Sequence, residues 1–255
     1  MRKFSRRRLA AAGFLLAVAG AGHAARPFIT DDARIVDPGA CQVETWFRFN
    51  RDSNEFWALP GCNPTGNLEL TVGGAYLPAD EPYAGRSTLL QVQAKTLFRA
   101  LTTNGWGVGL AAGGVIRPED VALQVPQFYA YVPASFSLRD DRVVIHANLG
   151  AAKLSRAAFE DPYVVNAAGQ RVKPSPGWSL TWGLGGEFEV ARNAYVIAET
   201  FGTNRDQPFF QGGVRVWLVP NRVQVDATIG SQAGDWSGAR WFSLGVRLLS
   251  PPFLR

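Results

Sequence analysis

Residues 177–191 read GWSLTWGLGGEFEVA, and this stretch decides the fold because its side chains alternate between two kinds. The first set is apolar and mostly large, and it comprises Trp178, Leu180, Trp182, Leu184, Phe188 and Val190. The second set is small or polar, and it comprises Ser179, Thr181, Gly183, Gly185, Glu187 and Glu189. Because successive strand residues point to opposite faces, this period of two predicts a strand that separates an apolar from a polar environment.

The same alternation recurs in eleven further stretches, while helical periodicity with capping residues is hard to find. The stretches are 41–50, 54–61, 67–77, 87–99, 105–116, 127–138, 142–153, 194–203, 208–219, 223–231 and 240–249. Most of them approach or exceed the ~9–11 residues of a tilted membrane strand. A soluble β-sandwich alternates as well, with its apolar face inward, so the alternation alone does not say which face is inside.

The connections between these strands favour a membrane barrel. The short connections are 62–66, 100–104, 139–141, 192–193 and 220–222. The longer connections are 77–86, 117–126, 154–177 and 232–238. Short and long connections thus broadly alternate, which is typical of tight periplasmic turns and longer external loops. We predict an all-β fold, a single antiparallel transmembrane β-barrel of about 12 strands over residues 41–255, with the N- and C-termini in the periplasm.

The first 24 residues have the pattern of a cleaved signal peptide. A basic start, residues 1–8, precedes an apolar run over residues 9–22, and Gly22-His23-Ala24 fits signal peptidase. The run is shorter than the ~20 residues of a membrane helix, which disfavours a membrane anchor. Ser5-Arg6-Arg7 also partly matches a twin-arginine signal, which would argue for a soluble periplasmic protein. We expect residues 1–24 to be removed and residues 25–40 to form a periplasmic N-terminal segment.

The net charge of +5 could indicate an acidic partner, but its distribution says otherwise. The chain has 26 Lys and Arg against 21 Asp and Glu. Five of the basic residues lie in residues 1–8, so the remaining chain is balanced and has no basic stripe. Nucleic acid is therefore not expected as a partner.

The two cysteines give a geometric expectation. Cys41 opens the first predicted strand and Cys62 follows the second, so both fall at the open end of one hairpin. An oxidising compartment permits a disulfide there, the alternative being two free buried thiols. With His146 as the one histidine beyond the signal peptide, a structural zinc site is not expected, and no other metal or cofactor is indicated.

Polar side chains on the alternating faces are candidates to line the lumen. They include Glu44, Arg48, Glu69, Lys95, His146, Glu187, Glu189, Glu199, Arg215, Asp226 and Arg247. Since both charge signs occur, they could form a structural ion-pair network or a polar conduit. Catalysis is disfavoured, because His146 points inward and no motif ties it to Ser135 or Ser137 on the neighbouring strand.

Aromatic residues gather near the predicted strand ends, where interfacial girdles would place them. They are Trp46, Phe47, Trp57, Tyr76, Phe98, Trp106, Phe128, Tyr129, Phe136, Trp178, Tyr195, Phe210, Trp217, Trp241 and Phe242. Ordinary strand propensity is the alternative explanation.

The start of the mature chain carries one further pattern. It reads Arg26-Pro27, then Thr30-Asp31-Asp32-Ala33, then Gly39 and a Glu44 in the first strand. This resembles the start of bacterial outer-membrane proteins described as "MetA-pathway of phenol degradation" or transporter. The shared motif covers residues 26–44, and the strand-rich remainder is similar in organisation. The resemblance implies an outer-membrane β-barrel for uptake of aromatic or other hydrophobic compounds.

The same segment has a structural expectation of its own. Asp31 and Asp32 could bind a cation or pair with Arg26 or Arg34. Because the segment precedes the first strand, we favour a plug or lid at the periplasmic mouth.

We therefore expect a bacterial outer-membrane barrel, not an enzyme, that binds a small compound or lets it pass. The alternatives are a closed structural or assembly barrel, an outer-membrane lipid hydrolase, and a soluble periplasmic β-protein. The expected partners are outer-membrane lipid and lipopolysaccharide, the barrel-assembly machinery and a small-molecule solute.

Overall fold

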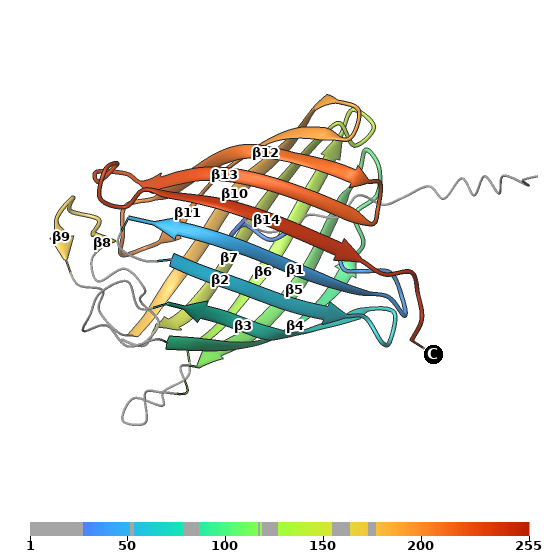
Figure 1. The fold of residues 1–255 in the computed structure, drawn as a ribbon, viewed down its shortest axis with the longest axis horizontal. Helices are drawn as coiled ribbons and strands as arrows, with labels where there is room; N and C mark the ends of the chain where they lie inside the picture. The colour runs from blue at the N-terminus through green and yellow to red at the C-terminus, as the bar shows by residue number, and fades with distance from the viewer. Residues whose placement is uncertain are drawn as a thin grey trace, which may run out of the picture.

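A closed antiparallel barrel dominates the computed structural model (Figure 1). The structure describes residues 28–51, 54–78, 87–116, 118, 127–154, 164–172 and 177–254. The barrel strands are β1 (Cys41–Asn50), β2 (Asn54–Cys62), β3 (Leu68–Leu77), β4 (Ser87–Arg99), β5 (Trp106–Ile116), β6 (Gln127–Leu138), β7 (Val143–Leu154), β10 (Gly177–Ala191), β11 (Ala194–Thr203), β12 (Phe209–Val219), β13 (Val223–Gln232) and β14 (Trp241–Leu249). Each strand pairs with its neighbours in chain order, and β1 pairs with both β2 and β14. The predicted fold class is confirmed.

The predicted strand bounds agree with the structure to within one residue at each end. Two short strands were missed. Within the long connection after β7, β8 (Val164–Val165) and β9 (Arg171–Val172) pair as a small separate hairpin. Strands of two residues are too short to show a period of two, so alternation could not reveal them.

The turns at one end of the barrel are tight because they contain residues in the left-handed region. Asn104 (φ 54°), Asn193 (φ 64°) and Asn221 (φ 57°) lie in three of them, and residues 139–141 lie in a fourth. Asn and Asp tolerate this conformation better than other non-glycine residues. The start of β1 and the C-terminus lie at the same end, on the right in Figure 1.

The two faces of the barrel wall separate as the alternation predicts. Leu180 and Leu244 point outward and are 57% and 47% exposed, whereas Ser243 and Arg247 point inward and are 1% and 3% exposed. An apolar outer face around a closed barrel suits hydrocarbon, because closure leaves no unpaired strand edge. The chain therefore has the fold of an outer-membrane barrel. The described residues include no helix that is long and apolar enough to cross a membrane.

The aromatic prediction is only partly right. Phe128, Phe136 and Trp178 are exposed on the outer face, but Trp217 and Trp241 are buried. Trp46 is buried as well, and its ring stacks on Trp57 with centroids 5.3 Å apart. The following six aromatic residues share the inward parity of their strands: Trp46, Trp57, Tyr129, Tyr195, Trp217 and Trp241. Closeness to a strand end does not decide the face; parity does.

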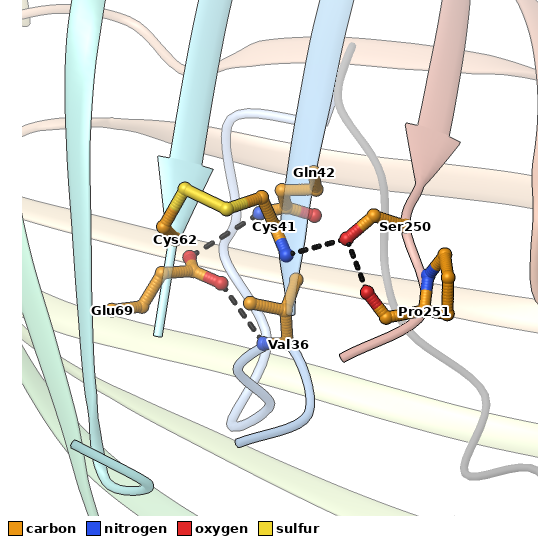
Figure 2. Close-up of a disulfide and its surroundings, with 7 residues drawn as sticks. All are labelled: Val36, Cys41, Gln42, Cys62, Glu69, Ser250 and Pro251. Atoms are coloured by element: carbon orange, nitrogen blue, oxygen red, sulfur yellow. Dashed lines mark hydrogen bonds between the residues drawn. A yellow bond between two sulfur atoms is a disulfide. The ribbon is translucent and has the colours of Figure 1, made fainter. Parts of the chain in front are cut away.

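The last residues of the chain meet the base of the first hairpin. Cys41 and Cys62 face each other in the β1–β2 register and form a disulfide (Figure 2). Ser250 Oγ accepts a hydrogen bond of 2.9 Å from the Cys41 amide. The amides of Phe253 and Leu254 donate to the carbonyl of Gly39 at 2.8 and 2.9 Å. Gly39 has φ +74°, and a Cβ there would lie 2.8 Å from the Leu254 carbonyl oxygen, so this close approach requires glycine.

Candidate functional site: the plugged lumen

Residues 28–40, which we call the N-terminal plug, run inside the barrel before β1 begins. Phe28, Thr30, Asp32, Ala33 and Val36 are all at most 2% exposed. The segment was expected to form a plug or lid at the periplasmic mouth over residues 25–40. Within the described residues it reaches deeper than the mouth, because its first residues contact side chains from the middle of β7 and β11.

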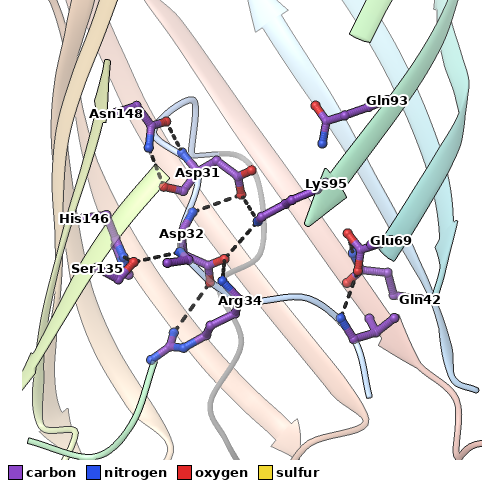
Figure 3. Close-up of polar contacts among 12 residues, drawn as sticks. Asp31, Asp32, Arg34, Gln42, Glu69, Gln93, Lys95, Ser135, His146 and Asn148 are labelled. Carbon is purple, nitrogen blue, oxygen red and sulfur yellow. Dashed lines mark hydrogen bonds and ion pairs between the residues drawn. The ribbon is translucent and has the colours of Figure 1, made fainter. Parts of the chain in front are cut away.

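The plug has no strand partner, so lumen side chains satisfy its backbone. The amides of Ile29 and Thr30 donate to the two carboxylate oxygens of Glu199 at 2.8 and 2.7 Å. Asn148 accepts from the Asp31 amide at 2.7 Å, and its Nδ2 donates back to the Asp31 carbonyl at 2.7 Å (Figure 3). Since buried backbone groups need partners, these polar side chains are what allow an extended segment to lie inside the barrel.

Two further acceptors hold the middle and the base of the plug. Ser135 Oγ accepts from the Ala33 amide at 2.8 Å. Glu69 Oε2 accepts from the Val36 amide at 2.9 Å (Figure 2). Glu69 Oε1 also accepts from Gln42 Nε2 at 3.3 Å (Figure 2). The plug is therefore attached to the wall along its length by groups from β3, β6, β7 and β11.

Lys95 supplies the charge contact of the plug. Its Nζ lies 2.9 Å from Asp31 Oδ1 and 3.3 Å from Asp32 Oδ1 (Figure 3). Tyr131 donates to Asp31 Oδ2 at 2.7 Å, and Arg34 lies 3.6 Å from Asp32 Oδ2. Burial by itself would raise the pKa of Asp32, but the charges of Lys95 and Arg34 outweigh it and hold that pKa below its ordinary value. The pairing predicted with Arg34 is present, and Lys95 is an unexpected second cation.

A second cluster of polar side chains lies beside Phe28, and it joins residues that no sequence motif connected. Ser135 Oγ is 2.8 Å from His146 Nδ1, and His146 Nε2 is 3.2 Å from Glu187 Oε1. Arg215 Nη1 donates to the same Glu187 oxygen at 2.7 Å. Serine, histidine and carboxylate in series have the order of a nucleophilic triad. Here, however, Ser135 and His146 have no exposed surface, and Ser135 Oγ already accepts a hydrogen bond from the Ala33 amide.

A third cluster closes the wall between β14, β1 and β13. Arg247 Nε donates to Gln42 Oε1 at 2.7 Å and lies 3.6 Å from Glu44 Oε1. Arg215 Nε is 3.9 Å from Asp226 Oδ2. These charges therefore occur in pairs of opposite sign, as burial in a narrow lumen requires.

The structure places the eleven predicted lumen residues of the strands on the inward parity of the wall. Two of them lie outside both the plug contacts and the clusters described above. Glu189 pairs with Arg142 at 3.3 Å near the periplasmic turns, and Arg48 lies over the Trp241 ring at 4.3 Å in the extracellular half. Arg26 lies outside the described residues. Sequence reasoning missed Tyr131 as a plug contact, although it shares the parity of Tyr129.

The space left around the plug is unequal on its two sides. Between the plug and the β1–β4 wall, beside Lys95, a cavity of about 30 Å³ remains, which is room for about one water molecule. On the extracellular side a larger cavity of about 300 Å³ reaches down to Ile29 and Thr30. Among the described residues, no group of three or more His, Cys, Asp or Glu side chains could hold a metal ion.

Solved structures support the fold. The KdgM porin matches with a TM-score of 0.56 at 8% identity, covering 81% of this chain and 98% of that one. The NanC porin matches with a TM-score of 0.54 at 8% identity, covering 82% and 98%. The COG4313 outer membrane channel from Pseudomonas putida F1 matches with a TM-score of 0.52 at 12% identity, covering 86% and 98%. At these identities the likeness shows a common barrel fold.

Sequence comparison places the chain in one family. No curated protein matches it in sequence. A family model with the description "Uncharacterised conserved protein UCP029691" matches residues 12–249, which is nearly the whole chain. The chain therefore belongs to the family of uncharacterised conserved protein UCP029691.

Proposed function

We propose that this protein is an outer-membrane channel for small compounds whose lumen is held closed by the N-terminal plug. The observation that carries the proposal is how the plug is held. It pairs with no strand and is attached through side chains such as Lys95, Glu199 and Asn148, so it can leave without breaking the barrel. The apolar outer face and the fold shared with porins support passage across an outer membrane.

Several expectations from the sequence stand with this proposal. An outer-membrane barrel is surrounded by lipid and lipopolysaccharide and is inserted by the barrel-assembly machinery, and its export relies on a cleaved signal peptide. The resemblance over residues 26–44 supports uptake of a hydrophobic or aromatic compound. The lipid-hydrolase alternative has little support, because Ser135 and His146 are sealed beneath the plug.

A closed structural barrel is the second candidate, and the paired charges of the lumen favour it. Two ion pairs occupy space inside the lumen, one between Glu187 and Arg215 and the other between Glu44 and Arg247. One experiment separates the two candidates. The full-length protein and a variant lacking residues 28–37 are inserted in planar bilayers and in liposomes, and conductance and solute-dependent swelling are measured.

The channel proposal expects low, infrequent conductance from the full-length protein and a much larger conductance from the deletion variant. Heat-modifiable migration on a gel checks that both barrels are folded. If the folded deletion variant neither conducts nor admits any solute, the channel proposal is wrong and the structural barrel is preferred.

A further inference from the structure

The larger cavity above the plug, which we call the vestibule, has a distinct chemistry. It has a volume of about 300 Å³ and lies in the half of the lumen nearer the long loops. Its lining comprises Ile29, Thr30, Gln91, Gln127, Tyr129, Tyr131, Asn148, Thr181, Trp182, Gly183 and Phe201. Within the described part of the chain, no residue of this lining is acidic or basic.

Two charged groups beside the plug residues of the vestibule are occupied, and Arg48 in the extracellular half lies over the Trp241 ring at 4.3 Å. Asp31 is bound by Lys95 and Tyr131, and Glu199 is bound by the amides of Ile29 and Thr30 and by Gln211. An ionised ligand would lose its water in the vestibule without meeting a free counter-charge in the lining. The lining therefore selects against charge.

Apolar and aromatic surface faces this space. Ile29 is 47% exposed at the tip of the plug, although it lies inside a polar lumen. The rings of Tyr129 and Tyr131 stack with centroids 6.1 Å apart, and Phe201 stacks on Phe209 at 5.6 Å. Flat faces of this kind bind other rings and burying them is favourable.

Hydrogen-bonding groups surround the aromatic faces. Gln127 and Thr181 line the vestibule and carry both donors and acceptors without net charge. At ~30 Å³ per water molecule, the cavity holds about ten waters, or one small ring compound in their place. Aromatic faces with an amide and hydroxyl edge match a ring that carries hydroxyl groups.

We propose that the vestibule binds an uncharged, hydroxyl-bearing ring compound of roughly ten non-hydrogen atoms on the tip of the plug. This inference deepens the proposed function, on which its role in passage rests, by naming the class of solute. The ring can be a sugar or an aromatic alcohol, because both offer a flat face with hydroxyl groups at its edge. The binding itself requires no opening of the plug.

The test uses two pairs of probes, each with a neutral and an anionic member. They are methyl glucoside with glucuronate, and benzyl alcohol with benzoate. Equilibrium dialysis with the purified full-length barrel in detergent measures binding at millimolar concentration. Phe201→Ala removes an aromatic face, and Gln127→Arg adds a cation to the lining. The matched control is Phe210→Ala, which removes a ring from the outer face of the neighbouring strand and keeps the same micelle.

The proposal expects the neutral member of at least one pair to bind at least ~10-fold more tightly than its anion. That binding should weaken about 5- to 10-fold in Phe201→Ala, stay unchanged in Phe210→Ala, and shift toward the anion in Gln127→Arg. The pair that binds identifies the source of the ring.

Three results would overturn the proposal: anions that bind as tightly as their neutral partners, equal binding by the two phenylalanine variants, or no binding by any probe. Migration of heated and unheated samples confirms that each variant is folded. Because dialysis measures the closed protein, binding without conductance would refute the channel alone, and conductance without binding would refute the vestibule site alone.

Discussion

Replacement of Lys95 by methionine should release the plug. Methionine keeps the unbranched apolar stem of the side chain but removes the ammonium group that lies 2.9 Å from Asp31 and 3.3 Å from Asp32. When the plug is docked, the buried Asp32 and the partly buried Asp31 have then lost this cation, while the contacts with Arg34 and Tyr131 remain. When the plug is free, water solvates both carboxylates. The substitution therefore destabilises the docked state specifically.

The expected size follows from the burial of this pair. Lys95 and Asp32 are 4% and 2% exposed, so the contact is far from an exposed surface salt bridge. Removing one partner of a buried ion pair costs about 3–5 kcal/mol. At about 1.4 kcal/mol per factor of ten, the ratio of docked to undocked plug should fall by roughly 100-fold to 4,000-fold.

Single-channel recording in planar bilayers measures this ratio as the open probability. Lys95→Met should open at least ~100-fold more often than the natural protein until the open state saturates. Lys153→Met is the matched control, since Lys153 lies at the extracellular end of β7, away from the plug contacts. The triple variant with Asp31→Asn and Asp32→Asn should recover much of the closure, because it leaves no unpaired carboxylate at this contact.

Two results would refute the reasoning. If Lys95→Met stays closed while deletion of residues 28–37 opens the channel, the ion pair does not hold the plug. If the triple variant opens as often as Lys95→Met, the effect comes from a changed barrel wall and not from the buried carboxylates.

Further predictions concern the disulfide, the acid range and the outer face. Cys41 and Cys62 should resist an alkylating reagent in the unreduced, denatured protein, and reduction should lower the unfolding free energy by about 3 kcal/mol in denaturant titrations. Because the pKa of Asp32 is lowered by its neighbours, its contribution to docking is complete above its unfolded pKa of about 4 and is lost only as pH falls through the lowered value. Between pH 7 and 5, the open probability should therefore depend on pH in the same way in the natural protein and in Asp32→Asn. If lowering the pH over that range opens only the natural protein, the reasoning is contradicted. Leu184→Arg on the lipid-facing side of β10 should destabilise the barrel by about 2–4 kcal/mol in vesicles, and an unchanged stability would place that face elsewhere than in lipid.

The barrel could be predicted because the alternation of side chains along each strand shows which residues share a face. Glu44, Trp46 and Arg48 share one parity, and that parity alone places Trp46 inside, where its nearness to a strand end suggested a girdle. The Ser135–His146 contact could also have been found. The tight turn at residues 139–142 fixes the β6–β7 register, which sets these two residues opposite each other.

The plug could be predicted only in outline. Residues 28–40 have no period, because each residue meets a different strand and no regular wall. Its partners are distant in sequence, since Thr30 and Glu199 are 169 positions apart and Asp32 and Lys95 are 63 positions apart. The width of the lumen decides which acceptor lies close to which amide of the plug. That width cannot be derived from the spacing of residues in the sequence.

If the plug is released as proposed, its covalent link into β1 and the hydrogen bonds from Phe253 and Leu254 to Gly39 would make that release reversible. They anchor its root between the first hairpin and the last residues of the chain, so a released plug remains tethered at the periplasmic mouth. A short tether keeps the free segment at an effective concentration in the millimolar range, and rebinding is then intramolecular. Opening would therefore be brief and self-limiting, and the outer membrane would regain its barrier without a second protein to close the channel.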